Sequence, residues 1–133
     1  MSNHEVNLNK GLNILIVEDD EISRVLLENS LKKLANNIYI ATNGEEAIEL
    51  AKNHDDIDVI LMDMGLPKIN GYEATKEIRK FNSDILIIAQ TAYALSNEKE
   101  LAIDAGCNLF LSKPININEL KEILNQKFKN KLL

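Results

Sequence analysis

Polar residues that could do chemistry occur at or just after the ends of four apolar runs in this chain. They are Glu18-Asp19-Asp20-Glu21, Asp63, Thr91 and Lys113. Carboxylates that lie close together raise one another's pKa and cost stability unless a cation lies among them. Hard oxygen ligands of this kind suit Mg²⁺, which takes one or two carboxylates together with a phosphate oxygen. The residue types therefore point to a divalent cation and to phosphoryl transfer, a reaction that depends mostly on positioning and charge stabilisation.

Each of these side chains has its own use in that chemistry. Asp63 would accept the phosphoryl group, Lys113 would neutralise Asp63 and then hold a phosphoryl oxygen, and Thr91 would donate to a second oxygen. Singly, each residue also has an ordinary structural explanation. Acids such as Asp20 and Glu21 suit the first turn of a helix, and a lone Asp or Lys after a strand is often a turn cap or a solvated charge. The functional interpretation depends on these residues meeting at one place.

The elements that would bring them together are strands that alternate with helices. Short apolar, β-branched runs predict strands at Leu12–Val17, Ile38–Ala41, Ile57–Met62, Ile85–Ala89 and Leu109–Leu111. Alternation at this spacing implies parallel strands joined by right-handed crossovers, and nearly continuous apolar runs imply helices on both faces. The fold is therefore expected to be a doubly wound α/β sandwich, in which ligands bind beyond the carboxyl ends of the strands.

The segments between these runs carry helix signals. Leu27, Leu31 and Leu34 recur at a spacing that places them on one helix face. Thr42–Glu45 and Asn116–Glu119 fit the capping box, in which a side-chain oxygen caps the first turn and an acid three residues later reaches back. We expect helices to begin at both positions.

Size and charge limit the classes of protein to consider. With 133 residues the chain has room for one domain, which we place at residues 11–130 after a flexible lead-in at residues 1–10. A formal charge of −6 is opposite to that of proteins that grip nucleic-acid phosphates. The single cysteine cannot form an internal disulfide, and no apolar run is long enough to span a membrane. These features predict a cytoplasmic protein without direct nucleic-acid or membrane contact.

Two other uses of such a fold lose support. Four carboxylates after the first strand would repel a nucleotide phosphate, and neither a dinucleotide-binding nor a P-loop glycine pattern is present. A phosphatase of the haloacid dehalogenase type would have a second Asp two residues after its nucleophile, whereas this chain has Asp63-Met64-Gly65. Nucleotide binding and phosphatase turnover are therefore disfavoured.

From about Leu12 to Phe128 the chain resembles the receiver domain of two-component signalling proteins. The matching stretches are Ile14–Asp20 (ILIVEDD), Met62–Gly71 (MDMGLPKING), Thr91-Ala92 and Leu111–Ile115 (LSKPI). Only the second is fairly specific alone, whereas the four in this order and at these distances form a specific set. The stretch Gly71–Arg79 and the last of the four look most like receivers appended to hybrid sensor histidine kinases.

The resemblance implies a flavodoxin-like sheet with strand order 2-1-3-4-5 and a phosphoacceptor site at its edge. Asp63 would accept a phosphoryl group from a phosphohistidine on a histidine kinase or histidine phosphotransfer protein, and Lys113 and Thr91 would bind the aspartyl phosphate. The Mg²⁺ ligands that it implies are Glu18, Asp19, Asp63 and the backbone carbonyl of Gly65. Family members commonly have two Asp in the acidic pair, so a shift of one residue would make the pair Asp19-Asp20.

A conformational switch is also implied by the resemblance. The Lys113-Pro114 bond would be cis and would aim the lysine into the pocket. Phe110 would turn inward as Thr91 moves to the phosphoryl group, although Phe110 could equally be ordinary core. The surface that would change its affinity for a downstream partner is formed by the helix after Ser96, the strand 109–111 and the helix after Asn116. Phosphorylation can shift the population only as far as it favours one conformation.

Two positions in the family influence dephosphorylation, and here they hold Gly65 and Tyr93. Because Gly65 has no side chain to orient an attacking water, we predict a persistent phosphoryl state. Tyr93, Ala94 and Leu95 are candidates for a moving loop, or for a plain surface turn.

Several alternatives stay open at this point. The chain could be a receiver-like interaction module that is never phosphorylated, or a metal-dependent hydrolase with Asp63 as nucleophile. The chain has no ATP-binding glycine loop, so nothing in it is a kinase. No independently turning-over enzyme is expected, although the chain could be the receiver part of a hybrid kinase or a single-domain regulator. We expect a monomer or weak dimer.

Overall fold

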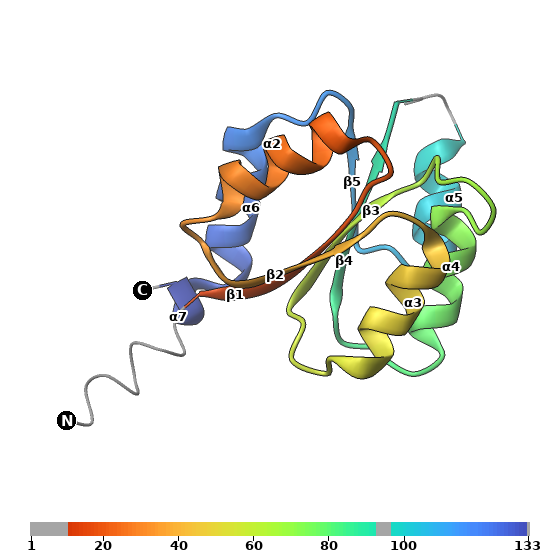
Figure 1. Ribbon diagram of the computed structural model, residues 1–133, viewed down its shortest axis with the longest axis horizontal. Helices are drawn as coiled ribbons and strands as arrows, with labels where there is room; N and C mark the ends of the chain where they lie inside the picture. Colours follow the sequence, from red (N-terminus) through yellow and green to blue (C-terminus); the bar gives the residue numbers. More distant parts are fainter. Residues whose placement is uncertain (1–10, 93–96, 133) are drawn as a thin grey trace.

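The computed structural model describes residues 11–92 and 97–132, and its centre is a five-stranded parallel sheet (Figure 1). The strands are β1 (Leu12–Val17), β2 (Ala35–Ala41), β3 (Val59–Asp63), β4 (Leu86–Thr91) and β5 (Leu109–Ser112). All neighbouring strands pair in parallel, in the order β2-β1-β3-β4-β5. The predicted doubly wound fold and its strand order are confirmed.

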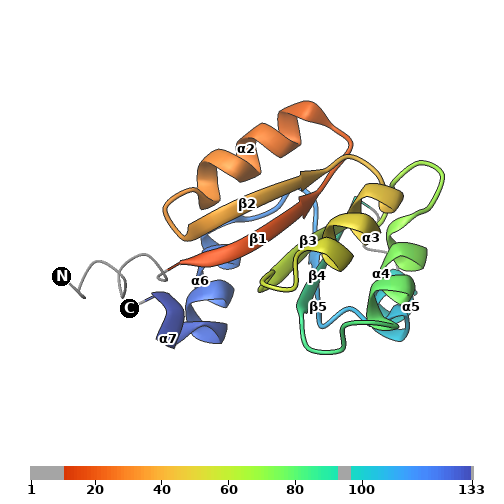
Figure 2. The same ribbon diagram turned by 60° about the horizontal axis from the view of Figure 1, so that its bottom comes forward.

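Helices cover both faces of this sheet. They are α2 (Glu21–Leu31), α3 (Gly44–Asn53), α4 (Gly71–Arg79), α5 (Glu98–Ala105), α6 (Ile117–Lys127) and α7 (Lys129–Leu132). Figures 1 and 2 show α2, α6 and α7 on one face and α3, α4 and α5 on the other. Each face has its own apolar layer, so the sheet is buried on both sides. None of the helices in the described part of the chain is long and apolar enough to cross a membrane.

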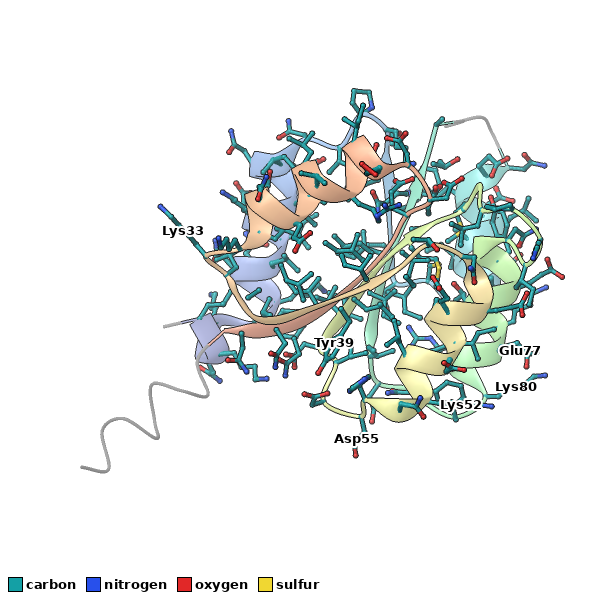
Figure 3. The ribbon with its side chains drawn as sticks, viewed as in Figure 1. Lys33, Tyr39, Lys52, Asp55, Glu77 and Lys80 are labelled. Carbon is teal, nitrogen blue, oxygen red and sulfur yellow. The ribbon has the colours of Figure 1, made fainter. Side chains whose placement is uncertain are left out.

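Alternation along the central strands supplies both layers. All six residues of β1 are buried, with Leu15 and Val17 in the layer under α3, α4 and α5, and Ile14 and Ile16 in the layer under α2 and α6. Because both sets are apolar, the sequence of the strand is a nearly continuous apolar run. This is typical of parallel strands that are buried on both faces. Charged side chains such as those of Lys33, Lys52 and Asp55 lie outside this core and point outward into solvent (Figure 3).

Strand β2 begins three residues before the predicted start at Ile38. Its first residues are polar, and Asn36 and Asn37 each donate a side-chain hydrogen bond to Oδ1 of Asn13, at 3.3 and 3.0 Å. Asparagine is disfavoured in strands, so the propensity of this segment gave no strand signal. Leu34 is a second correction, because α2 ends at Leu31 and Leu34 packs on the core from outside the helix.

Helix caps follow the sequence with one shift. Asn116 caps α6 by accepting from the backbone N–H of Glu119, as expected. For α3 the cap is Asn43 rather than Thr42, and it accepts from the N–H of Glu46. Thr42 instead donates from its backbone and its hydroxyl to the Glu46 carboxylate, both at 2.7 Å. The α6 cap is thus the predicted residue, and the α3 cap lies one position after the predicted residue.

Residues 1–10, predicted as a lead-in, lie outside the described residues. At the other end, α7 was not predicted. Its Lys131 carbonyl accepts from the N–H of Gly11 at 3.1 Å, and Leu132 packs on the apolar layer under α2 and α6. The two ends of the described chain therefore meet at the edge of the sheet opposite the acidic residues.

Candidate functional site

The carboxyl ends of four strands bring the predicted site residues to one edge of the sheet. Glu18 directly follows β1, Asp63 ends β3, Thr91 ends β4 and Lys113 directly follows β5. The strand register holds these ends level, since Val17 pairs with Met62 and Asp63 with Gln90. Residues from distant parts of the sequence are therefore neighbours because of the parallel topology.

Three carboxylates form the centre of this edge. Glu18, Asp19 and Asp63 each offer an oxygen, and these oxygens lie within 4.8 Å of one another. Glu18 is 1% exposed and Asp63 is 5% exposed, whereas Asp19 is exposed to solvent. Two buried carboxylates and one accessible carboxylate form a set of hard oxygen donors open to solvent on one side, which fits a Mg²⁺ ion that keeps part of its water shell.

Lys113 is the cation that faces this cluster. Its Nζ lies 2.8 Å from Oε1 of Glu18 and 3.3 Å from Oδ2 of Asp63. Burial raises the pKa of Glu18, and the nearby charge of Asp63 raises it further, while the hydrogen bond from Lys113 acts in the opposite direction. Burial alone would lower the pKa of Lys113, but the two carboxylates outweigh it and raise that pKa above its ordinary value. One ammonium thus serves two buried carboxylates, which leaves the cluster with excess negative charge.

The structure gives Asp20 a different place from Glu18 and Asp19. Asp20 is the N-cap of α2, and its carboxylate accepts from the N–H of Ser23 at 2.8 Å. That hydrogen bond lowers the pKa of Asp20. Its backbone N–H donates to Oε2 of Glu18 at 3.2 Å. The acidic group at this edge therefore contains Glu18 and Asp19, and Asp20 starts the helix.

The loop after β3 is held close beneath Asp63. The N–H of Gly65 donates to Oδ1 of Asp63 at 3.0 Å, and Gly65 is exposed. A Cβ at Gly71, the first residue of α4, would lie 2.8 Å from Cα of Met64 and closer still to the Asp63 carbonyl oxygen. Only glycine lets the helix start approach the strand end this closely. Asn70 then caps α4 with a complete capping box together with Glu73.

Thr91 and Phe110 lie on the last two strands, β4 and β5. Thr91 is buried, and its carbonyl oxygen accepts from the N–H of Lys113 at 2.8 Å. Phe110 is partly buried and packs on the apolar layer under α3, α4 and α5. The Lys113-Pro114 peptide bond is cis. The predicted moving loop, Tyr93 to Leu95, lies outside the described residues.

The comparisons with known proteins agree with this geometry. Residues 14–125 match the family described as the response regulator receiver domain. The chain belongs to this family. It is 36% identical over 120 residues to the sensor histidine kinase RcsC of Escherichia coli K12, which covers 90% of the chain and 12% of RcsC. It is 34% identical over 115 residues to two-component response regulator 24 of Arabidopsis thaliana, covering 86% of the chain and 83% of the relative.

Solved receiver domains have the same fold. The receiver domain of sensor histidine kinase PA1611 from Pseudomonas aeruginosa, with magnesium coordinated in its active site cleft, is 37% identical, with a TM-score of 0.79 over 87% of this chain and 96% of that one. The receiver domain of Ssk1 from Saccharomyces cerevisiae was solved with the histidine phosphotransfer protein Ypd1. That match is 32% identical, with a TM-score of 0.84 over 93% of each chain. Relatives such as RcsC are much longer than this chain, which spans about an eighth of RcsC.

One residue of this receiver edge was missed from the sequence. Gln90 pairs with Asp63 in the register of β3 and β4 and is 1% exposed. The signal was a single amide side chain at the end of the apolar run Ile87-Ile88-Ala89, just before Thr91. A polar residue inside such a run is unusual, because burying an amide costs free energy unless it is hydrogen-bonded.

Proposed function

We propose that this receiver domain is a phosphoacceptor, with Asp63 as the residue that is phosphorylated. The observation that carries the proposal is the environment of Asp63: a buried carboxylate 3.3 Å from the Lys113 ammonium, with Glu18 and Asp19 close enough to share a cation with it. A carboxylate is a weak nucleophile, and phosphoryl transfer to it depends on orienting the donor and stabilising the charge on the transferred oxygens.

The step we propose is in-line displacement at phosphorus. A carboxylate oxygen of Asp63 forms the new P–O bond as the P–N bond to a partner's phosphohistidine breaks, and the imidazole leaves with the electron pair of that bond and takes up a proton. Lys113 then holds one phosphoryl oxygen through a charge-assisted hydrogen bond, and the hydroxyl of Thr91 donates to another. Mg²⁺, bound by Glu18, Asp19, Asp63 and the Gly65 carbonyl, would supply positive charge to the phosphoryl oxygens.

The phosphodonor we propose is a histidine kinase or a histidine phosphotransfer protein. This class is supported by the Ypd1 complex of the Ssk1 receiver and by the similarity to RcsC, a sensor histidine kinase. We also place this domain in the cytoplasm, in line with a single cysteine that cannot form an internal disulfide.

The output surface we propose is formed by α5, β5 and α6. Leu101 and Ile103 of α5 are 46% and 44% exposed, which gives this surface apolar side chains for a partner. The hydroxyl of Tyr72 on α4 donates to the carboxylate of Glu98 at the start of α5, so α5 is tied to its neighbour. Movement of Thr91 and Phe110 on phosphorylation would be read out here.

Intact-mass spectrometry after incubation with Mg²⁺ and acetyl phosphate tests the acceptor. We expect one phosphoryl adduct on the wild type and none on Asp63→Asn. Asp58→Asn is the matched control, because Asp58 is a partly buried carboxylate paired with a lysine at the opposite edge of the sheet. It should keep the adduct.

Two results would contradict the proposal. The absence of an adduct on the wild type, even with a phosphohistidine donor, would favour an interaction module that is never phosphorylated. Repeated turnover of small phosphate esters would favour a metal-dependent hydrolase. Hydrogen exchange across α5, β5 and α6 tests the output surface. It should change when the wild type is treated with the phosphodonor, and it should stay the same when Asp63→Asn receives the same treatment.

A further inference from the structure

A cavity of about 410 Å³ lies next to the acidic cluster, between α2 and the segment that joins β5 to α6. Its apolar walls include Leu26 and Leu27 from α2, and Ile115 and Ile117 from the other side. Sites for small organic ligands have volumes of roughly 300–1,000 Å³ and are lined mostly by apolar side chains with a few polar groups. The cavity therefore has the size and the lining of a small-molecule site.

The polar group that marks this cavity is the amide of Gln90. Gln90 lines the cavity and is 1% exposed, and within residues 11–92 and 97–132 neither its Nε2 nor its Oε1 has a hydrogen-bond partner. A buried amide in this condition costs stability that an apolar side chain of similar size would not. A ligand that pairs with both amide atoms would recover that cost, which makes Gln90 the natural anchor.

Charge at the cavity favours a neutral ligand. Glu18 and Lys113 also line it, but they neutralise each other in an ion pair of 2.8 Å. The adjacent Asp63 and Asp19 add negative charge, so an anionic ligand would be repelled. A cation would be drawn to these carboxylates rather than to the apolar walls.

We propose that this cavity, which we call the Gln90 cavity, binds a small, neutral, planar molecule with a hydrogen-bond donor and an acceptor on neighbouring atoms. Primary amides, cyclic amides and amino-substituted heteroaromatic rings belong to this class. A glutamine amide pairs with such an edge through two parallel hydrogen bonds, as it does with adenine. The apolar walls cover the faces of the ring. Because the amide atoms are shielded from water, the proposal requires the Gln90 side chain to turn toward the cavity that it lines when the ligand enters.

Titration of the ¹⁵N-labelled protein with benzamide, 2-pyridone and adenine, followed by NMR, tests the proposal. We expect the side-chain amide signals of Gln90 and the backbone signals of Leu26 and Ile115 to shift in a saturable way. Toluene is the control probe, because it fits apolar walls but lacks the hydrogen-bonding edge. It should bind at least tenfold more weakly than benzamide.

Variants decide whether the amide is the anchor. Gln90→Leu should weaken binding of the amide probes at least tenfold while raising the melting temperature, since it removes an unsatisfied buried amide. Gln126→Leu is the matched control, because Gln126 is exposed on α6, and it should bind as the wild type does. Gln90→Met provides the same test with an unbranched side chain.

Several outcomes would overturn the proposal. They are unchanged affinity in Gln90→Leu and Gln90→Met, toluene binding as tightly as the amides, and an absence of shifts at Gln90 with every probe. Shifts confined to the exposed α2 residues Ile22 and Val25 would also overturn it, since they would indicate a surface for another protein.

Discussion

Two lysine–carboxylate groups lie at opposite edges of the same sheet, and they differ in how their charges balance. At one edge Asp58 receives two contacts of 3.0 Å from the ammonium of Lys131 and a hydrogen bond of 2.8 Å from the N–H of Asn13. At the other edge Lys113 is shared between Glu18 and Asp63, with Asp19 beside them. The first group has one cation for one carboxylate, and the second has one cation for three.

This difference in charge balance distinguishes a structural ion pair, Asp58 with Lys131, from the candidate functional site around Lys113. The Lys131 group fastens the last helix to the edge where β1 and β3 begin, and its carboxylate oxygens are satisfied within the protein. The Lys113 group keeps an excess of negative charge in a partly buried place, which costs stability. A similar pair of Glu77 and Lys80 lies on the outer side of α4, and being solvated it contributes little to stability (Figure 3).

The largest effect should come from removing each lysine. Without Mg²⁺, Lys113→Met leaves two buried carboxylates without a cation, and we expect it to lower the free energy of unfolding by about 3 kcal/mol. Lys131→Met breaks a pair in which the lysine is 42% exposed, and it should cost less than about 1 kcal/mol. Urea unfolding measures both. Equal losses in the free energy of unfolding would contradict the distinction between a structural ion pair and a cluster with excess negative charge.

Metal binding should also separate the two edges. Glu18→Gln removes a charged oxygen donor, and we expect the affinity for Mg²⁺ to fall at least about tenfold, or 1.4 kcal/mol. Asp58→Asn should leave that affinity unchanged, because Asp58 lies at the far edge. Calorimetric titration with Mg²⁺ gives both values. A comparable loss in Asp58→Asn would show that the effect is one of general charge.

The sequence predicted the edge with the excess charge much better than the other edge. The carboxyl ends of parallel strands lie at the same edge of a sheet, so Asp63 and Lys113 could be assigned to one place from the predicted strand ends. No comparable sequence pattern predicts the pairing of Asp58 with Lys131. That pairing depends on α7, a short helix that no apolar periodicity indicates. Gln90 was missed for a related reason: its strand could be predicted, but whether its amide finds a partner depends on the packing of α2.

Acidity should affect the two edges differently. Because the pKa of Glu18 is raised, the folded state binds the proton of this carboxyl group more tightly than the unfolded state does. In the unfolded state the pKa of Glu18 is about 4.5. Its contribution to stability is therefore fully present below that pH and is lost as pH rises through the raised pKa. In Mg²⁺-free urea titrations, the difference between wild type and Glu18→Gln should change over this range.

The control for that titration is again Asp58→Asn. Its stability should follow the same pH trend as the wild type over this range, since Glu18 remains in place. If Glu18→Gln and the wild type show parallel curves, the burial of Glu18 carries no cost in folding.

The smallest expected effect concerns the glycines near the two edges. A Cβ at Gly11 would lie 2.9 Å from the backbone nitrogen of Asn36, and its φ of +104° disfavours other residues. A Cβ at Gly65 would meet only Oδ1 of Asp63, at 3.7 Å. Gly65→Asn should therefore fold, and its amide would orient water near the phosphoryl group.

We expect the hydrolysis rate of phosphorylated Gly65→Asn to rise about threefold, or about 0.6 kcal/mol in the barrier. Gly65→Ala is the matched control, because it fills the same space without a hydrogen-bonding group, and its phosphoryl lifetime should equal that of the wild type. Loss of the adduct over time, followed by intact mass, measures all three. If the alanine variant hydrolyses as fast as the asparagine variant, the lack of a hydrogen-bonding side chain is not what preserves the phosphoryl group. Backbone freedom at Gly65 would then control the lifetime.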